Sequence, residues 1–294
     1  MRIDKVISLA SRDRRLPFLA MERSLRATGC DLPLWVIPHG EDVFDLPKGS
    51  HWWTERAVVD WLASVGAHPR MRKYQSLTVG NYQFADTDVI FLRNPEDVLE
   101  PYSGLVSACT EWNKPENTYT FKSRLVMSRR SSTFLKTVFN SGQFACDRPL
   151  YPSVDSLKET AMRREFRQTC IRYPADQPGV NLLAFESGVP VTNLTLPPIC
   201  MESTWAGDYP KDYERLWSAP DRKPLLIHWA GRVLERDLPI NQLFYQYLTR
   251  DERAEWDGHV RAERLKLAKW PLGVRIVNRG LRWWYRRYRV YRAW

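Results

Sequence analysis

The alternation of short apolar runs with helical stretches predicts an α/β fold around a central, mostly parallel sheet flanked by helices. Seven apolar runs are typical of strands, and helical stretches separate most of them, as in a sheet with helices on its faces. The 294 residues are 44% hydrophobic and 13% aromatic, which supplies a packed core and excludes a disordered chain. This length allows one large domain or two small ones.

The predicted elements follow one another along the chain. The runs expected to form strands are 5–10, 34–38, 82–92, 105–109, 139–146, 191–196 and 225–229. The stretches expected to form helices are 17–28, 54–65, 72–79, 153–169, 176–185 and 242–248. Pro17 suits the first turn of its helix, Thr54 can cap the next one, and Asn94-Pro95 is a further helix start.

Asp86 and Asp88 are the most informative residues of the chain. They lie two positions apart, so on an extended backbone both carboxylates point to the same side. Their neighbours are apolar, where two unpaired carboxylates would be costly and would repel each other. A divalent cation such as Mg²⁺ or Mn²⁺ would resolve this, at the strand end where open α/β sheets bind ligands. The alternative is a pair of polar turn residues that closes the strand.

Three further motifs follow Asp86-Thr87-Asp88 along the chain. They are Asn140-Ser141-Gly142, Asp176-Gln177-Pro178-Gly179-Val180-Asn181 and His228-Trp229-Ala230-Gly231. With these four motifs the chain resembles the GT-A nucleotide-sugar glycosyltransferases, in particular family 8, which contains glycogenin and bacterial galactosyl- and glucosyltransferases. The resemblance covers about residues 3–235 and implies the GT-A, Rossmann-like fold for them.

The resemblance implies that Asp86, Asp88 and His228 hold a divalent cation. His228 follows the apolar run 224–227, so it lies at a strand end as the aspartates do. Imidazole is a competent ligand for Mn²⁺, and Mn²⁺ is therefore favoured over Mg²⁺. The alternative is a structural, hydrogen-bonded histidine.

The resemblance also implies a site for a nucleoside diphosphate sugar. Residues expected to contact this donor are Ser8, Ala10, Arg12, Lys73, Asp86, Thr87, Asn140, Gly142, Gly231 and Arg232. Asp176 and Gln177 are expected near the anomeric carbon as catalytic residues. Ordinary alternatives are a solvated surface charge for Lys73 and Arg12, a β-bulge at Gly142 and a helix cap at Asp176.

The last motif departs from the family pattern. Family members continue to a Lys-Pro-Trp that contacts the diphosphate, whereas this chain reads Gly231-Arg232-Val233. We expect Arg232 to supply the missing positive charge, because a guanidinium binds phosphate through two parallel hydrogen bonds.

Together these residues predict transfer of a hexose from a nucleoside diphosphate sugar, a UDP-sugar being favoured, to a hydroxyl of a glycan or lipid-linked acceptor. Bacterial-type surface polysaccharide or glycoconjugate assembly is the expected setting. The cation, Arg232 and Lys73 would stabilise charge on the leaving diphosphate. Retention is favoured over inversion, since the leaving phosphate oxygen can then deprotonate the acceptor. Inversion needs a carboxylate, and Asp176 and Asp147 are the candidates.

Two other functions stay open. A sugar-nucleotide nucleotidyltransferase shares the general fold, but such enzymes usually carry a glycine-rich phosphate loop after the first strand, and residues 8–12 contain no glycine. A non-catalytic membrane- or RNA-binding module would use the body of the chain as a scaffold.

The net charge of +10 arises from 44 basic and 34 acidic residues, and their positions are uneven. Residues 259–294 contain 11 of the basic residues and one acid, which leaves 33 of each sign in residues 1–258. We therefore expect a glycosyltransferase domain over 1–258 and a basic aromatic tail over 259–294.

The tail has helical periodicity after Trp270-Pro271. Apolar and aromatic side chains recur every three or four positions at Val274, Val277, Leu281, Trp284, Tyr288 and Tyr291. Arginines recur in the same way at Arg275, Arg279, Arg282, Arg286 and Arg289. This pattern favours an amphipathic helix on an anionic membrane surface. Packing on the core or on a second subunit in a homodimer is the alternative, and nucleic acid is least favoured.

Cysteine usage and the N-terminal residues indicate the compartment. The five cysteines are scattered and never spaced as CxxC, which fits buried thiols in a reducing environment. Asp4 and Lys5 interrupt the segment where a signal peptide needs an apolar run, and no run approaches the length of a membrane span. We expect a cytoplasmic protein, peripheral on the inner face of the membrane.

Overall fold

The computed structural model describes residues 1–173, 175–231 and 234–268. The strands are β1 (Lys5–Ala10), β2 (Leu34–Pro38), β3 (Ser50–Trp52), β4 (Tyr82–Ala85), β5 (Val89–Phe91), β6 (Leu105–Ser107), β7 (Gln143–Cys146), β8 (Val191–Asn193) and β9 (Leu226–His228). The α-helices are α1 (Arg15–Ala27), α2 (Ala57–Ser64), α3 (Pro95–Leu99), α4 (Phe121–Arg130), α5 (Val154–Met162), α6 (Gln177–Glu186), α7 (Gln242–Tyr245) and α8 (Arg250–Ala268). Two 3₁₀ helices border the site, η1 (Arg12–Arg14) and η2 (Pro69–Thr78).

Seven strands form the central sheet in the order β3-β2-β1-β4-β7-β6-β8. Strands β3, β2, β1 and β4 are parallel, β7 runs antiparallel to β4 and to β6, and β8 is parallel to β6. The prediction of a mostly parallel α/β sheet is confirmed. Because β1, β2 and β4 point the same way, the loops after them meet at one edge of the sheet.

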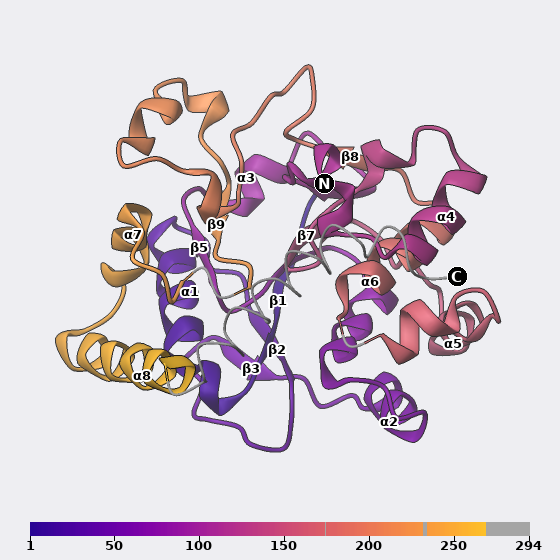
Figure 1. Cartoon of the computed structure of the whole chain (residues 1–294), viewed down its shortest axis with the longest axis horizontal. Helices are drawn as coiled ribbons and strands as arrows, with labels where there is room; N and C mark the ends of the chain where they lie inside the picture. Colours follow the sequence, from indigo (N-terminus) through magenta and orange to yellow (C-terminus); the bar gives the residue numbers. More distant parts are fainter. Residues whose placement is uncertain (174, 232–233, 269–294) are drawn as a thin grey trace.

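Helices cover both faces of the sheet (Figure 1). One face packs against α1 and α3 through side chains such as Phe18, Met21 and Val98. The other face packs against α2, α5 and α6 through side chains such as Trp61 and Leu157. Each layer is apolar on its inner side, so burial on both faces of the sheet holds the three layers together.

The prediction of one continuous strand over 82–92 is wrong. Strand β4 ends at Ala85, Asp86 to Asp88 form a turn, and β5 leaves the central sheet to pair antiparallel with β9. The sequence pattern is apolar throughout because both segments are fully buried, although they lie in different sheets. The two aspartates therefore lie in the turn and not on an extended strand.

Other boundaries shifted by a few residues. The helix predicted over 72–79 is the 3₁₀ helix η2, the helix predicted over 153–169 ends at Met162, and the strand predicted over 139–146 begins at Gln143. Strand β3 and helix α4 were not predicted. They are short or largely polar, so the apolar pattern gives little indication of them.

Helix α8 was not predicted either. Thr249 and Glu252 form a capping box, in which the Glu252 carboxylate accepts from the Thr249 N–H at 2.8 Å and the Thr249 hydroxyl accepts from the Glu252 N–H at 3.3 Å. Trp256 and Val260 pack this charged helix against the molecule. The helix runs through residue 258, where the sequence suggests a domain boundary, and the amphipathic tail beyond 268 lies outside the described residues. No helix of the described chain combines the length and the apolar character that a membrane span requires.

Candidate active site

Asp86, Asp88 and His228 lie together at the carboxyl edge of β4. One ligand atom from each side chain lies within 4.8 Å of the others, which suits a single metal ion. The His228 Nε2 is 3.2 Å from an Asp88 carboxylate oxygen. The three residues predicted as metal ligands are thus brought to one place by the fold.

The pairing of β5 with β9 explains this convergence. Val89 stands opposite His228 in the ladder, so Asp88 lies one residue from the histidine across the strand pair. The Trp229 N–H donates to the Asp88 carbonyl at 2.9 Å, and the His228 N–H donates to the Thr204 carbonyl at 2.7 Å. Backbone hydrogen bonds on both sides therefore fix the spacing of the two ligands.

Gly142 closes the cluster from the side of β7. Its carbonyl accepts from the Asp86 N–H at 2.8 Å. A Cβ at this position would lie 2.5 Å from an Asp86 carboxylate oxygen and closer still to the His228 imidazole. The glycine thus leaves open a small space beside two potential ligands. This space and the oxygen-rich donor set fit a divalent cation.

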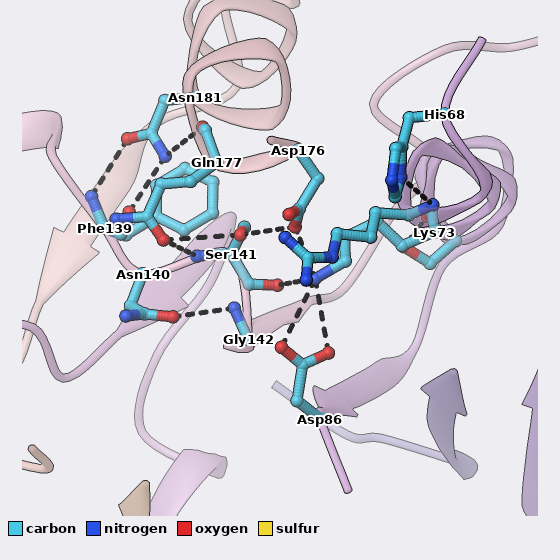
Figure 2. A network of polar contacts seen from close by, with 12 residues as sticks. His68, Lys73, Asp86, Phe139, Asn140, Ser141, Gly142, Asp176, Gln177 and Asn181 are labelled. Atoms are coloured by element: carbon cyan, nitrogen blue, oxygen red, sulfur yellow. Dashed lines mark hydrogen bonds and ion pairs between the residues drawn. The ribbon is translucent and has the colours of Figure 1, made fainter. Parts of the chain in front are cut away.

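Lys73 is the central charge of the site. It is buried, with its ammonium 2.6 Å from an Asp176 oxygen, 3.2 Å from an Asp86 oxygen and 3.2 Å from the Ser141 carbonyl (Figure 2). The interpretation of Lys73 as a solvated surface lysine is therefore wrong. Asp176, Asp86 and Asp88 thus bring three carboxyl groups to the surroundings of one ammonium.

Burial and neighbouring charges compete for the pKa values here. Burial alone would lower the pKa of Lys73, but Asp176 and Asp86 outweigh it and raise that pKa. Burial alone would raise the pKa of Asp176, yet Lys73 and Ser141 hold it below its ordinary value. Burial would likewise lower the pKa of His228, but Asp88 and then Asp86 raise it. For Asp86 burial prevails, and its pKa is raised.

The start of α6 carries the two residues expected to be catalytic. Asp176 precedes the helix, but its carboxylate makes no capping hydrogen bond to the helix and pairs with Lys73 instead. The Gln177 side-chain oxygen accepts from the Ser141 N–H at 3.1 Å, and its amide donates to the Thr118 hydroxyl at 3.0 Å. The Ser141 hydroxyl donates to Asp176 at 2.8 Å (Figure 2). Both side chains are held in single orientations.

Asn181 ties this helix to the segment before β7. Its side-chain oxygen accepts from the Phe139 N–H at 3.1 Å, and its amide donates to the Phe139 carbonyl at 2.8 Å and to the Gln177 carbonyl at 3.0 Å (Figure 2). The neighbouring Asn140 side chain accepts from the Gly142 N–H at 2.8 Å. These bonds fix where Asn140 and Gly142 stand relative to α6.

These groups surround a cleft of about 360 Å³. Predicted residues that line it are Lys73, Asp86, Thr87, Asp88, Asn140, Asp176, Gln177, His228 and Gly231. Residues that line it without having been predicted include Arg14, His39, His68, Arg70 and Ser141. Ser141 belongs to one of the four motifs, and that position could have been chosen. Of the other four, Arg14 lies in η1, His39 follows β2, and His68 and Arg70 begin η2, and no sequence motif marks these positions.

The first strand-to-helix connection differs from the expectation. Ser8 and Ala10 are buried in β1, and the Arg12 guanidinium binds Asp42 at 2.7 Å outside the cleft. The adjacent Leu9 and Ser11 line the cleft instead, because side chains alternate along an extended backbone. Arg232, also predicted, lies outside the described residues.

Asp147 is excluded as a base by its place in the sheet. Strand β7 is antiparallel to β4, so Gln143 stands opposite Ala85 at the site edge, whereas Cys146 stands opposite Tyr82 at the far edge. Asp147 follows Cys146 and binds the Gly104 N–H at 2.9 Å there. Asp176 is the carboxylate candidate that remains.

Comparison with known protein families and with curated protein sequences finds no match. Solved structures do match. The bifunctional glycosyltransferase WbbM superposes with a TM-score of 0.56 at 12% identity, over 87% of this chain and 51% of WbbM. The galactosyltransferase LgtC, in complex with donor and acceptor sugar analogues, superposes with a TM-score of 0.54 at 14% identity, over 85% of this chain and 99% of LgtC.

An active-site Gln-to-Glu variant of LgtC gives a TM-score of 0.52 at 13% identity, over 85% of this chain and 99% of the variant. The chain thus spans about half the length of WbbM and the whole length of LgtC. The resemblance predicted from the four motifs is confirmed at the level of the fold. The chain has the GT-A fold of these glycosyltransferases.

Proposed function

We propose that this protein is a metal-dependent glycosyltransferase. It moves a hexose from a nucleoside diphosphate sugar, a UDP-sugar being favoured, to a hydroxyl of a glycan or lipid-linked acceptor in bacterial-type surface polysaccharide or glycoconjugate assembly. The observation that carries the proposal is the arrangement of Asp86, Asp88 and His228 beside the Lys73–Asp176 ion pair in one cleft. The fold shared with LgtC, which was solved with donor and acceptor sugar analogues, supports it.

Asp86, Asp88 and His228 would hold the cation, Mn²⁺ being favoured over Mg²⁺. When bound, the cation would supply Lewis-acid stabilisation of the leaving diphosphate. Lys73 keeps Asp176 and Asp86 apart and in fixed positions through its short contacts with both. Gln177, held by Ser141 and Thr118, would present a fixed wall to the donor sugar beside Asn140 and Gly142. Gly231 and Arg232 would complete the donor site.

We favour retention of configuration. An inverting reaction needs a carboxylate free to take the acceptor proton, but Asp176 already accepts from Lys73 and Ser141. In a retaining reaction a phosphate oxygen of the leaving group takes that proton, and no further base is needed. Proton NMR of the freshly formed product tests this directly, since an anomeric configuration opposite to that of the donor would contradict retention.

The decisive experiment measures the release of nucleoside diphosphate from sugar nucleotides. A panel of sugar nucleotides is incubated with the protein, with and without Mn²⁺, and the released nucleoside diphosphate is quantified. We expect release from one donor class only when metal is present. No metal-dependent release from any donor would overturn the proposal. Formation of a sugar nucleotide from a sugar phosphate and a nucleoside triphosphate would instead support the nucleotidyltransferase.

Asp88→Asn is the first variant to measure. Removing the charge of one ligand should lower Mn²⁺ affinity and the rate of release by about 100-fold or more. Asp155→Asn makes the same chemical change on an exposed turn of α5 and should leave both unchanged. Full activity in Asp88→Asn contradicts the metal assignment.

For residues 259–294 we propose attachment to an anionic membrane surface, which would place the enzyme on the inner face of the membrane. The charge distribution supports this, because the excess of basic residues lies in that segment. Co-sedimentation with anionic liposomes should fall when Arg286 and Arg289 are both changed to Ser in the full chain. Unchanged liposome binding in this variant would favour packing of the segment on the core or in a homodimer. Binding of the full chain to RNA but not to liposomes would favour a nucleic-acid role.

A further inference from the structure

The cleft has a second, basic part that the proposed reaction does not use. Arg14, His39, His68 and Arg70 line it, and we call these four residues the basic rim. Arg14 ends the turn after β1, His39 follows β2, and His68 and Arg70 stand at the start of η2. The rim therefore belongs to the same edge of the sheet as the metal cluster.

Backbone contacts hold the two histidines of the rim. The His39 N–H donates to the Ala10 carbonyl at 2.8 Å and so extends the pairing of β2 with β1. The His39 and His68 rings stand edge to face with centroids 6.4 Å apart. The His68 Nδ1 accepts from the Arg70 N–H at 3.2 Å (Figure 2). A neutral His68 must then carry its proton on Nε2, so its free nitrogen is a donor.

The rim is rich in donors, and Asp13, a carboxylate beside Arg14 and His39, lines the same cleft. Arg70 forms no ion pair with a carboxylate among the described residues, and Arg14 has only a 3.7 Å contact with Asp13 on the exposed surface. Burial lowers the pKa of both His39 and His68, so at neutral pH each imidazole keeps one N–H to donate. Guanidinium and imidazole N–H groups together suit a phosphate or carboxylate.

The rim extends from His68 and Arg70, which precede Lys73 on the same segment, to His39 at the end of β2. His39 follows β2 and Asp86 follows β4, with β1 between these strands, so the two strand ends are roughly 10 Å apart. The inner part of the cleft is acidic, with Asp176 and the aspartates around Lys73. A diphosphate bound by the cation would therefore leave the His39 end of the rim for another anionic group.

We propose that the basic rim is a subsite for a phosphate or carboxylate group on the acceptor. This rests on the proposed function and adds the class of acceptor to it, namely one that carries a negative charge. Lipid-linked phosphates and acidic glycans both fit this chemistry. Arg70 supplies the free charge of the subsite, and His39 and His68 supply directed donors beside it.

The test follows the histidine side chains of the full chain by nitrogen NMR while inorganic phosphate is added at constant ionic strength. The chain has five histidines, and two of them serve as internal controls. His51 lies against Trp35 and His259 against Trp256, away from the cleft. We expect saturable shifts at His39 and His68 only. Equal shifts at His51 and His259, or no shift at all, would overturn the subsite.

Two variants assign the binding to the rim. Arg70→Ala should raise the dissociation constant for phosphate about tenfold, because it removes a charge-assisted hydrogen bond. Arg56→Ala removes another exposed arginine, which pairs with Asp60 on α2, and it should leave the phosphate affinity unchanged. Equal affinity in Arg70→Ala and in the unchanged protein would overturn the assignment.

A second titration tests whether the basic rim binds the acceptor or the donor. The titration is repeated with Mg²⁺ and saturating nucleoside diphosphate of the kind released in the activity assay. Phosphate should still shift His39 and His68, since the rim is free for the acceptor. Displacement of phosphate by the nucleotide would show that the rim belongs to the donor and would overturn the proposal. The phosphate arm alone needs no catalysis, so its failure is distinct from failure of the glycosyltransferase assignment.

Discussion

Gly142 determines how closely the chain can approach the potential metal ligands. A Cβ there would stand 2.5 Å from an Asp86 oxygen, a distance that forces the carboxylate or the His228 imidazole to move. The sequence pattern alone allows two explanations for such a glycine, a sugar contact and a β-bulge. The structure favours a third one, which is room for the metal cluster.

Gly142→Ala should therefore reduce Mn²⁺ affinity by at least about tenfold, because it displaces ligands without removing any of them. Isothermal titration with Mn²⁺ measures this. Gly258→Ala is the control, since a Cβ at that position in α8 meets nothing within 4 Å. A Gly142→Ala protein that binds Mn²⁺ as tightly as the unchanged chain would show that Gly142 does not provide space for the metal ligands.

At the scale of elements, Asn181 joins α6 to the strand entry before β7. Asn181→Ala leaves the Phe139 N–H and carbonyl buried without their partner, at a cost of about 1–3 kcal/mol for each group. Urea unfolding measures the loss of stability. Asn113→Ala, an exposed position in the loop before α4, should be neutral. Gln177 and Ser141 depend on the same junction. We therefore expect kcat to fall by a larger factor than the factor by which the KM for the donor changes.

The contact between α1 and α8 has a pH dependence of known sign. The hydrogen bond from Arg23 holds the pKa of Glu252 at about 2, below its ordinary value of 4.5. A lowered folded-state pKa adds stability that is complete above the ordinary value and is lost as the pH falls towards 2.

Glu252→Gln should thus cost on the order of 1 kcal/mol at pH 7, since solvent screens the pair, and the deficit should vanish as the pH approaches 2. Unfolding by urea across this range measures it. Glu159→Gln, exposed on α5, should show no deficit at either pH. A deficit that stays constant down to pH 2 would point to lost packing and not to lost charge.

The strands and helices also show which parts of the fold can be predicted from the sequence. The strands 5–10 and 34–38 were predicted to the residue, because an apolar run bounded by polar turns has few other structures. The break between β4 and β5 was missed, since an apolar run does not tell which sheet each half joins. Helix α8 was missed although Thr249 and Glu252 carry a capping-box pattern, because few of its side chains are apolar.

For the site, the resemblance carried by the four motifs indicated Asp86, Asp88 and His228 as metal ligands and Lys73 as a donor contact, and the structure places all four residues in one cleft. The motifs could not locate His39, His68 and Arg70. His39 follows β2, whereas His68 and Arg70 stand at the start of η2, and the order of strands β2, β1 and β4 brings these two segments to the same cleft. Long-range topology of this kind leaves no local pattern in the sequence.

At the scale of the whole molecule, the metal cluster joins the central sheet to the β5–β9 pair. Asp86 follows β4, Asp88 directly precedes β5 and His228 ends β9, so a bound cation would link the central sheet to the smaller one. Free Mn²⁺ at about one hundred times its Kd should stabilise the folded chain by about 2.7 kcal/mol. In thermal unfolding this should raise Tm by about 4–5 °C, and EDTA should reverse it. Asp88→Asn should show no such shift, and an equal shift in that variant would exclude the cluster as the binding site.

Charge is also divided at this scale. The body, residues 1–258, is formally neutral, so the chain would meet an anionic donor through a local cation and a few placed side chains. The net charge of +10 belongs to the terminal segment. Binding to an anionic surface and binding of substrate should therefore respond to salt separately.

The pairing of Val89 with His228 also fixes when the site can exist during protein synthesis. Asp88 and His228 are 140 positions apart, so a ribosome that adds about 5–20 residues per second makes the second ligand roughly 7–28 s after the first. Until β9 emerges and joins β5, the nascent chain holds two aspartates without their histidine. Capture of a metal through all three ligands would thus be a late event, and it would mark a chain whose two sheets have met.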